Sequence, residues 1–171
     1  MKKIIFIIAV TIFTMQGMAQ ESQLNKIFDK YSGQEGYTSI HITSYMFELF
    51  AKIAEDDAAE FDNITKGLDA IKILTSDGNE EQRKQFYEDL NKALPASVYK
   101  DFMVINDGGQ EIIFKVRDEG DKITEFVMIV KDPKEPVLLF LQGDIDLAQV
   151  AKMSKSMDIK GFEHLEKVDD K

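Results

Sequence analysis

The sequence predicts one α+β domain, built on a single mixed or antiparallel sheet with a C-terminal four-strand meander and with helices packed mainly on one face. Two observations support this fold class. Apolar residues recur at helical spacing at several places before residue 95, whereas from residue 99 onward they alternate or run continuously between short turns. The chain has 171 residues, 44% of them hydrophobic and 30% charged, which is typical of one globular domain. Helices that precede an antiparallel meander are characteristic of α+β proteins.

The first predicted elements are a helix, a strand and a second helix. Ser22 is suited to cap the first helix, whose apolar residues fall at positions i, i+3, i+4 and i+7: Leu24, Ile27, Phe28 and Tyr31. Residues 38–43 alternate and predict a half-buried strand. Ser44 then begins a helix with a wide apolar surface, formed by Tyr45, Met46, Phe47, Leu49, Phe50 and Ile53. We therefore expect this second helix to be well buried.

A short strand and a third helix complete the first half of the domain. The strand is predicted at residues 70–75. Asn79 and Gln82 have the spacing of a capping box, which starts a helix that runs to Leu94. Pro95 ends this helix because proline lacks the backbone donor that a helix interior needs.

The meander is predicted from four apolar segments, at residues 102–105, 112–116, 123–130 and 137–141. Asn106–Gly109 is a strong hairpin signal, because these residue types tolerate positive φ angles. A last helix begins at Asp146 and is followed by a polar tail, residues 166–171. The main domain is thus expected over residues 20–165.

Both faces of the meander are apolar in the middle. By strict alternation, the third strand carries Ile123, Val127 and Ile129 on one face and Phe126, Met128 and Val130 on the other. Ile113 interrupts the polar face of its own strand. Either the first helix covers the second apolar face, or another copy, a partner protein or an apolar ligand does so. The candidate interaction face consists of Ile113, Phe126, Val127, Met128 and Ile129.

The first 19 residues have the layout of a secretory signal peptide. Lys2 and Lys3 precede an apolar run, and the small residues Gly17 and Ala19 stand at the −3 and −1 positions of a cleavage site before Gln20. The apolar run is shorter than the roughly 20 residues that span a bilayer. We therefore expect export to the periplasm or the medium, with a soluble product and no stable membrane anchor after cleavage.

Composition excludes several classes of site and partner. The chain has no cysteine and two histidines, which excludes disulfides, thiolate metal sites and multi-histidine metal sites. After cleavage, 19 basic residues face 31 acidic residues, a formal charge of −12. Such a surface repels nucleic acid phosphates and anionic lipids, so we expect no nucleic acid partner.

Four segments together resemble one protein family: Phe28–Gly33, residues 38–43, Ile71–Leu74 and Gly143–Leu147. They are similar to segments of small exported bacterial proteins catalogued as domain of unknown function 4252, and the resemblance covers nearly the whole mature chain. Many members carry a lipoprotein cysteine after the signal peptide, and this chain does not. The resemblance implies no activity, cofactor or catalytic residue.

The sequence holds no credible catalytic, cofactor-binding or metal-binding constellation. His41 shares a strand face with Ser39 and Thr43, but no nucleophile motif accompanies it. Asp144 and Asp146 are spaced like cation ligands, but the further ligands of an EF-hand are absent, and a turn acid and a helix cap explain the pair without a metal.

We therefore expect a non-catalytic envelope protein that binds through an apolar sheet face or edge, its partner being either an unidentified envelope protein or a second copy. The alternative is a periplasmic carrier of a small apolar ligand, held against the wide apolar surface of the second helix. A hydrolase that uses His41 ranks third.

Overall fold

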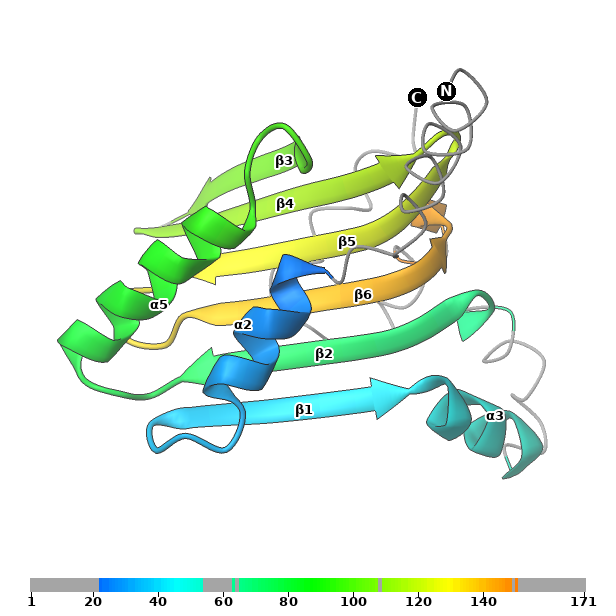
Figure 1. Cartoon of the computed structure of the whole chain (residues 1–171), viewed down its shortest axis with the longest axis horizontal. Coiled ribbons are helices and arrows are strands. Elements are labelled where there is room, and N and C mark those ends of the chain that lie inside the picture. The colour runs from blue at the N-terminus through cyan, green and yellow to red at the C-terminus, as the bar shows by residue number, and fades with distance from the viewer. Residues whose placement is uncertain (1–21, 54–62, 64, 108, 149, 151–171) are drawn as a thin grey trace, which may run out of the picture.

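The computed structural model describes residues 22–53, 63, 65–107, 109–148 and 150, and it consists of one sheet with helices around it (Figure 1). In chain order the elements are α2 (Gln23–Tyr31), β1 (Tyr37–Thr43), α3 (Ser44–Ile53), β2 (Leu68–Ser76), α5 (Glu80–Ala93), β3 (Lys100–Asp107), β4 (Gln110–Glu119), β5 (Lys122–Lys131) and β6 (Val137–Ile145). The fold is α+β, as the sequence predicts.

All six strands pair antiparallel, in the order β1-β2-β6-β5-β4-β3. The last four strands follow one another along the chain and across the sheet, which makes them a meander. β2 then pairs with β6, and β1 pairs with β2. The N-terminal pair of strands therefore extends the sheet on the β6 side, and β1 and β3 are its two edges.

The helix ends follow from local sequence. The Ser22 hydroxyl accepts a hydrogen bond from the Leu24 amide at 3.2 Å and caps α2. At the start of α5 the Asn79 side chain accepts from the Gln82 amide at 3.0 Å, and the Gln82 side chain accepts from the Asn79 amide at 2.8 Å. This is the predicted capping box, which satisfies two amides that a helix start leaves without partners.

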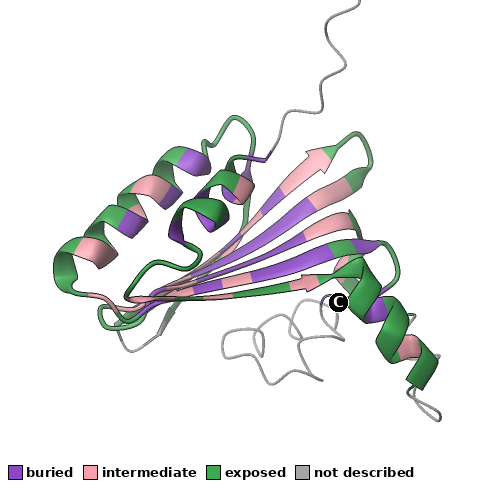
Figure 2. Ribbon diagram, turned by 60° about the horizontal axis from the view of Figure 1, so that its bottom comes forward, coloured by how far each residue is buried: buried purple, intermediate pink, exposed green. Residues whose placement is uncertain are grey.

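α2 and α5 lie together on one face of the sheet (Figures 1 and 2). Their apolar residues pack with Leu74, Val127, Ile129, Leu138 and Phe140 in one buried cluster. The two helices are also joined through Asp89 of α5, whose carboxylate accepts hydrogen bonds from Lys30 and Tyr31 of α2. The first helix therefore shares a face with the third and does not cover the opposite face.

The opposite face carries a second apolar cluster. Its buried members from β4, β5 and β6 are Ile112, Phe114, Val116, Phe126, Met128, Leu139, Leu141 and Ile145. Among the described residues outside the sheet, Phe47 of α3, Leu147 and Val150 pack against it. Both faces of the meander are thus buried, and Figure 2 shows the central strands as buried along most of their length.

One residue of β5 lies on the face opposite to its predicted one. The sequence predicts Ile123 beside Val127, but Ile123 packs in the cluster of Phe126 and Met128. The pairing of β5 with β4 shifts register between Arg117 and Asp118, whose partners are Glu125 and Ile123, so Thr124 has no partner position on β4. A bulge at Thr124 adds one residue to the strand, and one extra residue moves every preceding side chain to the other face.

The second helix, α3, is much less buried than predicted. Phe47 is its one residue in the buried class, at 8% exposure. Its other large apolar side chains are 40–70% exposed: Tyr45, Met46, Leu49, Phe50 and Ile53. In Figure 2 α3 projects beyond the end of the sheet and is mostly exposed, and Phe47 is its one buried contact with the core. The wide apolar surface was therefore a correct observation, but the inference of deep burial was wrong.

Several predictions concern residues outside the described ranges. These are the signal peptide over residues 1–19, the domain limits at 20 and 165, the tail over 166–171, His164, and most of the last helix. The start of that helix is described: the Asp146 carboxylate accepts a hydrogen bond from the Ala148 amide at 2.8 Å, as a cap does. Within the described ranges, no helix has the length and apolar character needed to cross a membrane.

Candidate functional site

The five residues of the sequence-predicted interaction face lie on two opposite faces of the sheet. Phe126 and Met128 belong to the cluster with Phe47, whereas Val127, Ile129 and Ile113 belong to the cluster under α2 and α5. The four β5 residues are at most 4% exposed, and Ile113 is half-buried. As placed, they form parts of two cores rather than one accessible surface.

β1 is an edge strand of the sheet and has an uncharged sequence. β1 pairs with β2 in unbroken register from Tyr37 to Thr43, and within the described chain it has no other strand partner. The strand contains no proline and no lysine, arginine, aspartate or glutamate. Ile40, in the middle of the strand, is 47% exposed. An edge of this kind presents free backbone donors and acceptors with no device that prevents pairing.

His41 does not add a charge to this edge. Burial, followed by the nearby Lys72 ammonium, lowers the pKa of His41 below its ordinary value, so the imidazole is neutral at pH 7. Its ring packs edge-on against Phe28, with ring centres 5.8 Å apart. Among the described residues no hydrogen bond joins His41 to Ser39 or Thr43, and Ser39 bonds instead to Ser32, at 2.9 Å. The arrangement expected of a nucleophile and its base is not assembled here.

The β3 edge differs from the β1 edge because it carries features that disfavour pairing. Its register with β4 shifts between Asp101 and Met103, which indicates a bulge. Lys100 forms an ion pair with Asp118 at 2.7 Å, and Asp101 forms one with Lys115. Bulges and edge charges are common means by which proteins prevent unwanted strand addition. The two edges of this sheet are therefore not equivalent.

An exposed apolar stripe continues from the β1 edge into α3. The helix begins at Ser44, directly after β1 ends. Met46, Leu49, Phe50 and Ile53 lie at i, i+3, i+4 and i+7, so they share one side of the helix. All four are at least 40% exposed. We call Ile40 together with these four residues the β1–α3 surface.

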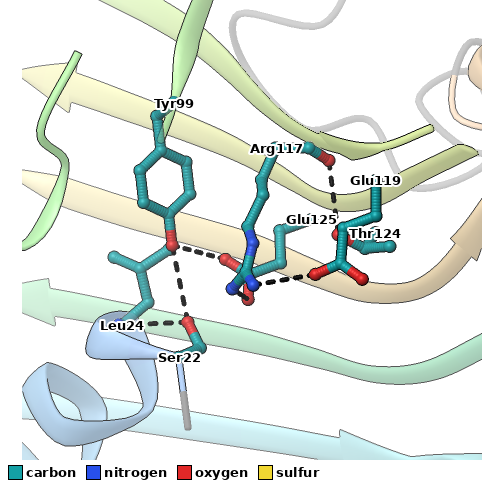
Figure 3. Close-up of polar contacts among 7 residues, drawn as sticks. All are labelled: Ser22, Leu24, Tyr99, Arg117, Glu119, Thr124 and Glu125. Carbon is teal, nitrogen blue, oxygen red and sulfur yellow. Dashed lines mark hydrogen bonds and ion pairs between the residues drawn. The ribbon is translucent and has the colours of Figure 1, made fainter. Parts of the chain in front are cut away.

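A second feature is a polar network at the end of the sheet where β4 ends and β5 begins (Figure 3). Glu125 is 4% exposed and accepts a hydrogen bond from the Tyr99 hydroxyl at 2.5 Å. Arg117 lies directly opposite Glu125 on β4 and donates to it at 3.3 Å and to Glu119 at 2.8 Å. Tyr99 also lies 3.5 Å from the hydroxyl of Ser22, at the cap of α2.

Burial and hydrogen bonding keep the Tyr99 phenol protonated in this network. Desolvation, together with the hydrogen bond to Glu125, raises the pKa of Tyr99 well above its ordinary value, so the phenol remains a donor. A nearly buried carboxylate requires such partners, because an unpaired buried charge is strongly unfavourable. Arg117 donates two of its five N–H groups to the two glutamates. The carboxylate of Glu125 is thus fixed in position.

Sequence reasoning did not identify this network. One available signal was Glu125 itself, a charged residue inside the otherwise uncharged run Ile123–Val130. The other members are ordinary strand and loop residues that only the fold brings together, since Tyr99 and Glu125 are 26 positions apart in the chain.

The two acidic residues considered as cation ligands are engaged separately. Asp144 forms an ion pair with Lys122, and Asp146 caps the turn at Ala148. Throughout the described part of the chain, no group of three or more histidine, cysteine, aspartate or glutamate side chains is arranged to hold a metal ion.

Comparison with known proteins identifies one family. The family model described as Domain of unknown function (DUF4252) matches residues 31–153, more than half of the chain. A search of curated proteins finds no match. The matched range contains α3, α5 and all six strands, and it begins at the last residue of α2.

Proposed function

Because the chain belongs to the DUF4252 family, whose description names no reaction, we propose a function from the geometry: an exported, non-catalytic protein that binds an extended segment of another envelope protein along the β1 edge. In this mode, called β-augmentation, a peptide adds one strand to an open sheet edge. The single observation that carries the proposal is the contrast between the unguarded β1 edge and the bulged, charged β3 edge.

The β1–α3 surface supplies the side-chain contacts that such binding requires. Main-chain hydrogen bonds give affinity without sequence preference, and side-chain contacts on alternate positions give specificity. Ile40 is directly opposite Ile73 of β2, so its side chain projects from the face where Phe47 of α3 packs. A segment paired with β1 would therefore direct alternate side chains toward the same face as Ile40, beside the exposed stripe of α3.

The charge of the chain favours a different protein over a second copy as the partner. The formal net charge is −10, so two copies repel each other at long range. The β1 edge itself is uncharged, and an uncharged edge accepts an apolar strand without leaving a charge buried. We expect a partner segment with apolar residues at alternate positions and a neutral or basic character.

The test uses site-specific crosslinking in intact cells. A photo-crosslinking amino acid is placed at Thr38 of β1 or, as a matched position on the other edge, at Asn106 of β3. We expect Thr38 to yield one reproducible crosslinked protein, identified by mass spectrometry, and Asn106 to yield none.

Two substitutions then separate the edges. Ile40 and Val104 are both 47% exposed, and each lies in an edge strand. Ile40→Lys places a charge on the β1–α3 surface and should abolish the Thr38 crosslink, whereas Val104→Lys should leave it intact. If Thr38 crosslinks only to other copies of this chain, the partner of the β1 edge is a second copy and not another envelope protein. Equal crosslinking from both edges would refute the β1 proposal.

A further inference from the structure

One side of α3 is both apolar and exposed. Met46, Leu49 and Ile53 lie at i, i+3 and i+7, and they are 40%, 45% and 61% exposed. Phe47, in contrast, is 8% exposed and packs in the core. A helix of a folded domain buries its apolar stripe against another element, so a segment that packs on this side of α3 would complete the pattern.

α3 and the segment after β6 start from the same end of the sheet. β1 and β6 both end there (Figure 1). Thr43, the last residue of β1, pairs with Ala70, which is itself paired with Gln142 of β6. Neighbouring strands are about 4.8 Å apart, so Thr43 and Gln142 lie roughly 10 Å apart. This separation matches the roughly 8–10 Å between the axes of two packed helices.

A helix starts after β6 and is packed on the core where the described chain ends. The Asp146 carboxylate caps this helix, and the Val150 amide donates a hydrogen bond to the Asp146 carbonyl at 3.1 Å. Val150 is 2% exposed and belongs to the same buried cluster as Phe47 of α3. The sequence that follows Val150 therefore continues from the face of the sheet on which α3 packs.

This following sequence has the apolar spacing that a partner of α3 requires. Met153 and Met157 come at i+3 and i+7 from Val150, which is typical of one side of a helix. Two further apolar residues come later, at Phe162 and Leu165. α3 has 10 residues and is about 15 Å long, so ten helical residues after Val150 would run its full length.

Charge distinguishes the same sequence from the rest of the chain. Residues 151–160 contain three lysines and one aspartate, whereas the whole chain has a formal net charge of −10. A basic segment is attracted to an acidic domain, whereas a second copy of the chain is repelled. Residues 151–165 thus combine apolar positions with basic character, the chemistry that we expect for an occupant of the β1–α3 surface.

We propose that residues 151–165 pack against the exposed side of α3 and cover it while no partner is bound. Met153 and Met157 supply the first contacts, since the flexible methionine side chain adapts to an irregular apolar surface. One consequence rests on the proposed function: a partner strand finds the backbone of β1 open but has to displace these residues from α3. The covered state then lowers the apparent affinity for the partner.

Photo-crosslinking in the purified protein tests the contact. A photo-crosslinking amino acid is placed at Leu49 of α3 or, as a matched position on β3, at Val104, which is 47% exposed. We expect Leu49 to crosslink within the same molecule to a peptide from residues 151–165, identified by mass spectrometry of the monomer band. Val104 should give no such product. Ile53 is the second α3 position if the protein substituted at Leu49 fails to fold.

Two matched double variants then show which side of the segment makes the contact. Met153→Asp with Met157→Asp should reduce the Leu49 crosslink at least about tenfold, because burying a carboxylate in an apolar contact is strongly unfavourable. Ser154→Asp with Ser156→Asp adds the same charge at polar positions between the methionines. It should leave the yield of the crosslink within about twofold.

Two results would overturn the proposal. The first is that Leu49 crosslinks only to other molecules or to nothing. The second is an equal loss in both double variants, which would mean that overall charge and not the apolar side holds the segment.

The competition with a partner is measured separately, in cells. Met153→Asp with Met157→Asp should raise the yield of the Thr38 crosslink, because the partner no longer displaces the segment. An unchanged yield would overturn the competition alone. The Leu49 experiment contains no partner, so its outcome is independent of whether the β1 edge binds one.

Discussion

Removing the charge of Asp89 should loosen the attachment of α2 to α5. Asp89 is 12% exposed at its side chain and accepts hydrogen bonds from Lys30 at 2.5 Å, Tyr31 at 2.7 Å and Gln85 at 3.0 Å. Burial opposes ionisation, but these bonds outweigh it and lower the pKa of Asp89 to about 2. Because the folded pKa lies below the ordinary value of 3.8, the ionised carboxylate stabilises the folded state at neutral pH.

The size of this effect follows from the pKa difference. At about 1.36 kcal/mol per pKa unit, the shift corresponds to roughly 2 kcal/mol. Lys30 is about half exposed, so solvent screening reduces this figure, and we expect about 1–2 kcal/mol. The contribution is complete above about pH 5 and is lost as the pH falls through 3.8 toward 2, since the unfolded chain takes up the proton first.

The assay is urea unfolding of the wild-type protein, Asp89→Asn and the control Asp77→Asn at pH 7, 4 and 2.5. Asparagine retains the shape of the side chain but not its charge. We expect Asp89→Asn to lower the free energy of unfolding by about 1–2 kcal/mol at pH 7, and by much less at pH 2.5. Asp77→Asn should change it by less than about 0.5 kcal/mol. A difference for Asp89→Asn that stays constant with pH would refute the electrostatic argument, because its cause would then be shape.

Three further substitutions test local features of the fold, each by thermal or urea unfolding. Gly143→Ala should destabilise the protein by more than about 2 kcal/mol, because φ is +135° and an added Cβ would meet the carbonyl oxygen of Gly67. Asn79→Ala removes the capping box and should lower the free energy of unfolding by about 1 kcal/mol while the fold stays the same. Tyr99→Phe removes a donor from the nearly buried Glu125 and should cost about 1–3 kcal/mol at pH 7. If Gly143→Ala leaves the free energy of unfolding unchanged, the close approach to Gly67 is contradicted. If Tyr99→Phe leaves it unchanged, the hydrogen bond to Glu125 contributes no stability.

The sequence predicts elements well where the cause is local. The cap at Ser22, the capping box at Asn79 and the hairpin around Gly109 each depend on residues within four positions of one another, and each is present. The side of the sheet that α2 covers depends instead on pairing between β2 and β6, more than 60 residues apart along the chain. Apolar periodicity identifies the buried stripe of a helix but not the surface that buries it.

The bulges explain why the site was harder to predict than the fold. A bulge at Thr124 leaves the apolar pattern of β5 looking regular, yet it reverses the face of Ile123 and places Glu125 beside Arg117. No pattern in a single strand reveals this, because the shift is a property of two strands. The exposure of α3 has a similar origin: its amphipathic stripe is evident from sequence, but its position beyond the sheet end is set by the tight junction with β1.

The polar network around Glu125 and the α3 end of the β1–α3 surface lie near one irregular end of the sheet, whereas β1 itself runs in unbroken register along β2. The last residue of β1, Thr43, pairs with Ala70, next to the bulge that exposes Asp69. At the other end of β2, around Leu74, the sheet is held beneath α2 and α5 in regular register. Regular pairing under a packed cluster resists local opening, whereas interrupted pairing with exposed side chains allows adjustment to a ligand. The regular end therefore holds β1 in place as a pairing edge, and the interrupted end leaves its side chains room to adjust.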